Sequence, residues 1–144
     1  MISTKTFLTL AGVLAVAGGA FYALSAGSPQ EARLEVYETT FVMPALSAEA
    51  QEGERYFNAV CAACHGQNGL GTTQGPPLVH DIYNPGHHAD MAFLMAAQNG
   101  VRAHHWRFGN MPPQQVTRGE VARIVTYIRE LQQANGITYR PHSM

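Results

Sequence analysis

The five consecutive residues Cys61-Ala62-Ala63-Cys64-His65 determine what kind of fold this 144-residue chain adopts. The two cysteines are three positions apart, about one turn of a helix, so on a helix their sulfur atoms lie on the same side. At that spacing two thiols can reach neighbouring vinyl groups along one edge of a porphyrin, and the histidine that follows can meet the central iron. The motif therefore predicts a covalently attached haem, with His65 as an iron ligand.

Other uses of a closely spaced cysteine pair fit this sequence less well. A thioredoxin-like redox pair lies between a strand and a helix in a βαβ unit, and no such alternation surrounds Cys61 and Cys64. A structural zinc site needs two further ligands at matching spacing, and the chain has no second cysteine pair. If the two cysteines were buried thiols with no functional role, the adjacent His65 would be unexplained.

The overall composition is that of one modest globular domain, which excludes a multidomain enzyme. Apolar residues make up 46% of the chain and charged residues 13%, and the formal net charge is −1. Nine basic residues against ten acidic ones leave no positive excess to neutralise phosphates. The composition therefore gives no support to nucleic-acid binding.

An uncharged segment precedes the globular part. Residues 7–24 contain no charged residue, and Lys5 is the only basic residue before Arg33. We interpret residues 1–26 as an export signal that sends the rest of the chain across a membrane. The segment is longer than the roughly 7–15 residues of a cleaved signal core and approaches the roughly 20 of a membrane span. We expect a protein on the periplasmic side of the bacterial inner membrane, anchored by this N-terminal segment. The alternative is a soluble periplasmic protein, released by cleavage near Ala26.

Behind this segment the chain divides into three further parts. Residues 27–46 are interpreted as a tether, in which the alternating stretch 34–38 can pair as a short strand. We expect residues 47–136 to form the globular domain and residues 137–144 to form a C-terminal tail. Frequent glycine and proline predict long loops in the domain. So much loop leaves a thin core, and we expect something other than side chains to fill its middle.

Three helices are predicted within the domain. The first follows the N-cap Ser47 and carries both cysteines at its far end. The second spans residues 90–99, with Asp90 as its N-cap and Gly100 where a helix stops. The third follows a capping box at residues 117–120 and ends at Asn135-Gly136. Its apolar residues recur at helical spacing: Val121, Ile124, Val125, Ile128 and Leu131.

These motifs, in this order, resemble those of a class I c-type cytochrome, a small helical electron carrier with one haem. The resemblance covers nearly the whole globular part. It implies an all-α fold, with about three main helices and their loops wrapped round one covalent haem c, in addition to the N-terminal apolar helix. It also implies that the first helix packs against the last through Gly53, Phe57 and Tyr127.

The resemblance also identifies a partner for the proximal histidine. In the family, a proline carbonyl in a stretch like Gly75-Pro76-Pro77-Leu78 accepts a hydrogen bond from that histidine. Such a bond fixes the orientation of the imidazole and tunes it as a ligand. We favour Pro76 as the acceptor, with Pro77 as the alternative.

The sixth iron ligand determines what the iron can do. Met111 lies in a loop where two following prolines stiffen the backbone, and the Met-Pro motif of the family points to the same residue. Met91 and Met95 are four apart on a helix, a spacing more typical of core packing. The competing ligand is His104 or His105.

Ligation by His65 and Met111 implies a saturated iron. Such an iron transfers single electrons and leaves no position for oxygen or peroxide, which a peroxidase would need. We therefore expect an electron carrier and not an enzyme. Its partners would be a donor and an acceptor redox protein, with no small-molecule substrate.

The chain is also rich in histidine, with seven in all and five between positions 80 and 105. Two adjacent pairs can bring several imidazoles together, and imidazole suits zinc or copper. We therefore keep a second metal site at His87, His88, His104 and His105 as a hypothesis, and with it a metal-handling or sensing function. The simpler interpretations are bonds to haem propionates or a docking face whose charge changes near neutral pH. Trp106 is expected to pack over the propionate side of the haem.

Overall fold

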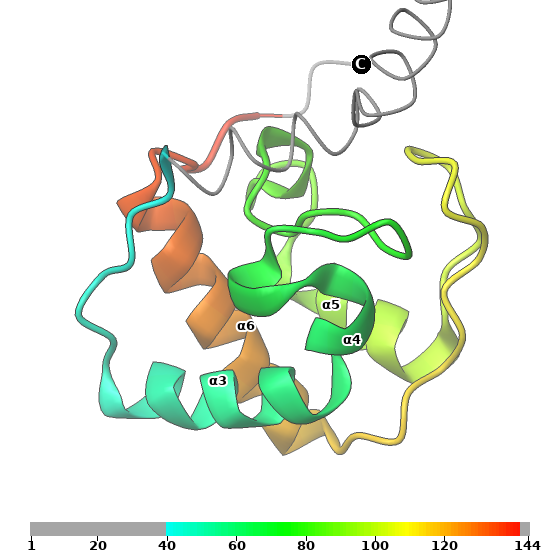
Figure 1. The fold of residues 1–144 in the computed structure, drawn as a ribbon, viewed down its shortest axis with the longest axis horizontal. Helices are drawn as coiled ribbons and strands as arrows, with labels where there is room; N and C mark the ends of the chain where they lie inside the picture. The colour runs from blue at the N-terminus through cyan, green and yellow to red at the C-terminus, as the bar shows by residue number, and fades with distance from the viewer. Residues whose placement is uncertain (1–39, 142–144) are drawn as a thin grey trace, which may run out of the picture. The chain divides into compact units, whose positions relative to one another are not determined.

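A computed structural model of the protein describes residues 40–141. This part of the chain is helical and contains no strand, as the predicted all-α class requires. It has four α-helices, with two short 3₁₀ helices between the second and the third, and loops that join them. The four α-helices are labelled in Figure 1. The elements are α3 (Ala48–Val60), α4 (Ala62–His65), η1 (Gln67–Gly69), η2 (Asp81–Tyr83), α5 (Asp90–Asn99) and α6 (Arg118–Ala134).

Part of the expected organisation lies outside the described residues. This applies to the export segment 1–26, to the possible strand at 34–38, and to the tether as far as residue 39. Among residues 40–141, no helix is both long enough and apolar enough to cross a membrane. The segment boundaries expected from the sequence therefore stay predictions.

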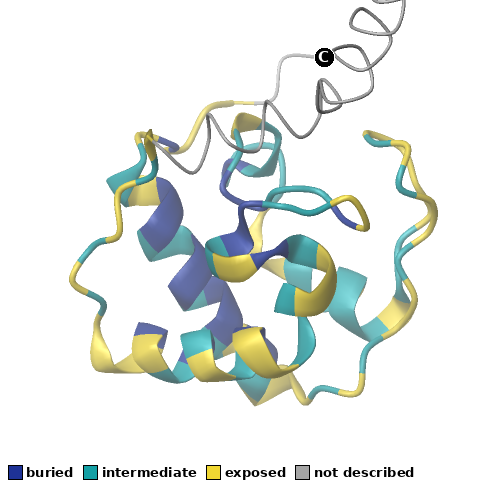
Figure 2. Ribbon diagram, viewed as in Figure 1, coloured by how far each residue is buried: buried dark blue, intermediate teal, exposed yellow. Residues whose placement is uncertain are grey.

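The core lies where α3 packs against α6, and Figure 2 shows the buried residues concentrated on these two helices. Phe57 and Tyr127 are fully buried, and their ring centroids are 5.6 Å apart. Gly53 lets the two backbones approach, because a Cβ atom at this position would collide with the carbonyl oxygen of Arg123. The predicted contact of Gly53 and Phe57 with Tyr127 is confirmed.

The helix ends follow the predicted capping residues at two places. The Ser47 hydroxyl accepts a hydrogen bond from the amide of Ala50 at 3.1 Å and starts α3. Thr117 and Glu120 form the capping box of α6, in which the Glu120 carboxylate accepts from the Thr117 amide at 2.7 Å. Gly100 ends α5 with a φ of 74°, a conformation that glycine adopts without strain.

Two details of the predicted helices are wrong. The first helix does not run continuously through the cysteines: it ends at Cys61, where the Cys64 amide bonds the Cys61 carbonyl at 3.2 Å in a tighter turn, and α4 follows. The N-cap of α5 is Ala89 and not Asp90. The Asp90 carboxylate instead forms an ion pair with Arg129 of α6, at 2.8 Å.

Helix α5 is apolar, yet none of its residues is buried. Met91 and Met95, expected to pack in the core, are 59% and 47% exposed. The reason is that α5 packs against α6 only along one side. Another side, which includes Phe93 and Ala96, lines a cavity. The thin core predicted from the sequence therefore corresponds to a hollow beside α5.

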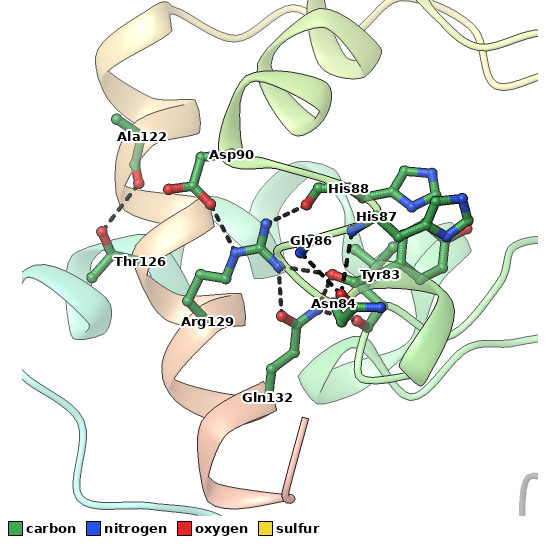
Figure 3. A network of polar contacts seen from close by, with 11 residues as sticks. Tyr83, Asn84, Gly86, His87, His88, Asp90, Ala122, Thr126, Arg129 and Gln132 are labelled. Carbon is green, nitrogen blue, oxygen red and sulfur yellow. Dashed lines mark hydrogen bonds and ion pairs between the residues drawn. The ribbon is translucent and has the colours of Figure 1, made fainter. Parts of the chain in front are cut away.

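Two polar residues of α6 hold the loop between η1 and α5, and Figure 3 shows the network that they form. Gln132 is fully buried, and its amide nitrogen donates to the carbonyls of Leu78 and Tyr83 at 2.8 and 3.1 Å. Arg129 donates to the carbonyls of Tyr83, at 2.7 Å, and of His88. This loop is therefore anchored to the C-terminal helix through its backbone.

We predict that Gly53→Ala destabilises the domain by about 1–3 kcal/mol, because the added methyl group overpacks the contact between α3 and α6. The free energy of unfolding in denaturant measures the effect. Gly119→Ala is a matched control in α6, since its Cβ would meet only the end of the flexible Arg123 side chain, at 3.5 Å. That control should be neutral or stabilising by up to about 1 kcal/mol. Equal unfolding free energies for the two variants would contradict the close contact.

We predict that Gln132→Leu destabilises the protein by about 1–3 kcal/mol, because it removes the side-chain donor to the Leu78 carbonyl and one of the two donors to the Tyr83 carbonyl. The same change at the exposed neighbour Gln133 should have an effect within about 0.5 kcal/mol. Amide hydrogen exchange of the η2–α5 loop should accelerate in the Gln132 variant only. Unchanged exchange there would show that Gln132 does not hold the loop.

Candidate functional site

An apolar cavity of about 530 Å³ lies among α3, α4, α5 and the loop before α6. Its volume is within the usual range for a small-molecule or cofactor site. Four of the five residues predicted to bind the haem line it: Cys61, His65, Pro76 and Met111. Most of the remaining wall is aliphatic or aromatic, with Phe57, Leu78 and Phe93 among its members.

Cys61 and Cys64 lie one turn apart at the start and near the end of α4. Neither forms a disulfide; Cys61 is partly buried and lines the cavity, whereas Cys64 is exposed and does not. The carbonyl of Cys64 is held by the Thr72 hydroxyl at 2.6 Å. Burial, and secondly the nearby Cys64, raise the pKa of the Cys61 thiol to about 11. Redox-active cysteines have lowered pKa values, so this environment argues against a thiol–disulfide redox pair.

His65 is held by the loop that follows α4. Its Nδ1 donates a hydrogen bond to the carbonyl of Pro76 at 2.9 Å, so Pro76 and not Pro77 is the acceptor. Because Nδ1 carries the proton, Nε2 is the nitrogen that offers a lone pair. Burial lowers the pKa of His65, although the bond to Pro76 opposes that change. The neutral imidazole that results is the form that binds a metal.

Met111 is at the end of the loop 101–111, whose first and last residues pair with each other. The backbones of Val101 and Met111 exchange two hydrogen bonds, of 2.9 and 3.0 Å, in an isolated antiparallel bridge. Gly100 precedes this bridge, and a Cβ atom there would crowd the Met111 carbonyl and Pro113. Met111 lines the cavity, as does Met95 of α5. Two methionines of the described residues can therefore be compared as candidate ligands.

The two adjacent histidine pairs, far apart in the sequence, lie together. Ring centroids are 4.5 Å apart for His87 and His88, 4.2 Å for His104 and His105, and 5.1 Å for His87 and His105. One nitrogen from each of His87, His88 and His105 lies within 4.8 Å of the other two. His104 is outside this group of three but stacks on His88, with centroids 6.2 Å apart.

His88 belongs both to the wall of the cavity and to the group of histidines. It lines the cavity together with His104 and His105, whereas His87 does not. Burial lowers the pKa of His88, and the nearby His87, His104 and Arg129 act in the same direction. The hydrogen bond to the Ile82 carbonyl opposes them. The net effect favours a neutral imidazole.

Trp106 also lines the cavity, and its indole nitrogen donates to the Tyr83 hydroxyl at 3.1 Å. Its ring meets His80 edge-on, with centroids 5.1 Å apart. Its position over the propionate side of a haem stays a prediction. Tyr83 and the anchoring residues Arg129 and Gln132 were not identified from the sequence. Arg129 and Gln132 could have been found from their spacing, because they are three positions apart and each directly follows an apolar residue of the predicted helix, Ile128 or Leu131.

The cavity and its lining fit a covalently bound haem. The donor set is the one that such a group needs: two free thiols one turn apart, a neutral imidazole with a fixed orientation, and a thioether on another segment. Apolar walls match the faces of the porphyrin. The 13-residue α3 and the short α4 place Cys61 in the wall of this cavity and Cys64 one turn further along the chain.

Comparison with known proteins agrees with this fit. The family model named "Cytochrome c" matches residues 50–132, which is more than half of the chain and includes Cys61, His65 and Met111. No curated protein matches the chain, and no solved structure does. Members of this family are haem-based electron carriers. The chain therefore belongs to the cytochrome c family, as a class I c-type cytochrome that binds haem c covalently.

Proposed function

We propose that this protein is a one-electron carrier whose single haem c has His65 and Met111 as its axial ligands. The observation that supports this proposal best is that both side chains line the same apolar cavity, although they come from segments 46 positions apart (111 minus 65). A carrier with both axial positions filled needs no substrate site. It exchanges electrons with proteins and performs no further chemistry.

The protein has three tasks in this function. Haem c, when bound, supplies a one-electron change between ferric and ferrous iron. Cys61 and Cys64 hold the group through thioether bonds, and the Pro76 carbonyl orients His65 so that Nε2 is available to the iron. Met111 offers its sulfur from a loop that the bridge to Val101 closes. A thioether raises the reduction potential relative to a second imidazole.

The walls of the cavity also serve electron transfer. Apolar side chains such as Phe57, Leu78 and Phe93 exclude water, so the surroundings rearrange little when the charge on the iron changes. The fixed loop contacts act in the same direction, because ligands that are already oriented need not move.

The proposed location rests on the first part of the sequence, and the proposed partners rest on the one-electron chemistry. We propose a donor and an acceptor redox protein on the periplasmic side of the bacterial inner membrane, since residues 7–24 are uncharged and resemble an export signal. An uncleaved segment would restrict electron exchange to the membrane surface. Cleavage near Ala26 would release a soluble carrier.

A metal-handling or sensing function is the second candidate. The observation that favours it is the convergence of His87, His88, His104 and His105 beside the cavity. The two functions are compatible, because the proposed iron ligands His65 and Met111 are not among these four histidines.

We predict that Met111→Ala keeps its haem, because the thioether bonds remain, but loses the sulfur ligand. The reduction potential should fall, and ferric protein should bind cyanide or imidazole at least about tenfold more tightly than the parent. Potentiometry and absorbance titrations measure both effects. Met95→Ala is the matched control, since Met95 is the other methionine of the described residues that lines the cavity.

The outcomes separate the possible ligands. The ligation proposal fails if Met111→Ala keeps the spectrum and potential of the parent. It also fails if Met95→Ala causes the larger change, and Met95 of α5 is then the sixth ligand. If only His104→Ala or His105→Ala alters the spectrum, a histidine is the sixth ligand.

We predict that the mature protein, isolated from the membranes of its native host, has the mass of residues 1–144 plus one haem. The reason is that the uncharged segment is closer in length to a membrane span than to a cleaved signal core. Mass spectrometry of the intact protein measures it. A mass equal to that of a chain starting near residue 27 would favour the soluble alternative. A mass that does not include the haem would contradict the covalent attachment.

A further inference from the structure

The two histidine pairs come from loops that the sequence does not connect directly. His87 and His88 lie between η2 and α5, and His105 lies in the loop closed by the bridge between Val101 and Met111. Even so, one ring nitrogen of each of these three histidines lies within 4.8 Å of the other two. Only the tertiary fold creates this cluster.

The imidazoles of His87 and His88 are already oriented. Both Nδ1 atoms donate to the carbonyl of Ile82, at 3.0 and 2.8 Å. A carbonyl can only accept, so Nδ1 carries the proton and Nε2 is left as the nitrogen with a lone pair. This arrangement, in which the other ring nitrogen bonds a backbone carbonyl, is the usual support of a histidine that binds a metal.

The backbone beneath these two residues is fixed as well. The amides of His87 and His88 donate to the Asn84 carbonyl at 3.0 and 2.9 Å, and Arg129 holds the carbonyl of His88. Figure 3 shows both rings projecting together from this anchored loop. A site on such a rigid support loses little entropy when it binds a ligand.

We propose that His87, His88 and His105 bind one divalent transition-metal ion through their imidazole nitrogens. The chemistry of three imidazoles selects ions such as zinc and copper over calcium and magnesium, which prefer oxygen ligands. Among first-row divalent ions, Cu(II) binds such a site most tightly. Metal–nitrogen bonds of about 2.1 Å require ligand atoms that lie close together, and the three nitrogens are within 4.8 Å of one another before any ion binds.

The charges around the cluster are compatible with a cation. Arg129 is a fixed positive charge that acts on His88, and it is paired with Asp90 at 2.8 Å. His104 stacks on His88 and lies close to His105, so it is available as a fourth imidazole. Water completes the coordination where the site faces solvent.

Metal binding has a consequence for the neighbouring cavity. The ion joins the loop anchored on α6 to the loop that carries Met111, and His88 and His105 line the cavity itself. A bound ion therefore restrains the Met111 loop and adds positive charge near the haem. This consequence rests on the proposed ligation by Met111, whereas the metal site does not.

Isothermal titration of the untagged holoprotein with Cu(II) tests the site, and Zn(II) is the second probe. We expect one ion per protein with a dissociation constant below about 1 μM for Cu(II) and weaker binding of Zn(II). His87→Ala should weaken binding at least about tenfold. It should leave the haem spectrum unchanged, because His87 does not line the cavity. Paramagnetic resonance of the Cu(II) form should show nitrogen ligands that decrease in number in this variant.

His142→Ala is the control, since it removes a histidine that belongs to neither pair. The proposal is overturned if Cu(II) does not bind below about 10 μM, or if His142→Ala weakens binding as much as His87→Ala does. A second readout concerns the Met111 loop: with Cu(II) bound, cyanide should enter the ferric protein more slowly. Binding of Cu(II) without slower cyanide entry supports the metal site but contradicts its connection to the Met111 loop. A changed spectrum in Met111→Ala tests the ligation separately.

Discussion

The close packing of α3 against α6 is the constraint on which the rest of this structure depends. Gly53 has no side chain, so the backbone of α3 can lie against the Arg123 carbonyl, and Phe57 and Tyr127 are buried beside it. This contact fixes the end of α3, and therefore the position of the turn that carries both cysteines. A larger residue in place of Gly53 would separate the helices and shift the attachment point relative to the rest of the cavity.

Helix α6 has a second role, because it also fixes the loops that complete the site. Gln132 and Arg129 bond the backbone of the loop before α5 and not its side chains. The loop is therefore free to present imidazoles to the cavity and to one another. The same helix thus supports the cofactor through its apolar face and the histidine cluster through its polar residues. A domain with so little core can remain ordered in this way, since buried polar bonds replace part of the missing apolar contact.

Much of the fold could be predicted because its signals are local. The caps at Ser47 and Thr117, the stop at Gly100 and the spacing of Cys61 and Cys64 depend on residues close together in the sequence. The errors are of a different kind. Asp90 has the right residue type for an N-cap, but a long-range partner on α6 takes its carboxylate. Met91 and Met95 have core spacing, but α5 packs mainly against α6, and both side chains remain exposed.

The sequence by itself determined the haem chemistry, since covalent attachment needs two thiols and an imidazole at fixed spacing within a single turn. It also determined the helical class, because caps and apolar periodicity are properties of short segments. Only the tertiary structure decided that Pro76 and not Pro77 accepts from His65, and that two histidine pairs 17 positions apart (104 minus 87) meet beside the cavity. The physical reason is that these contacts join loops, whose relative positions depend on how the helices pack and not on the residues within each loop.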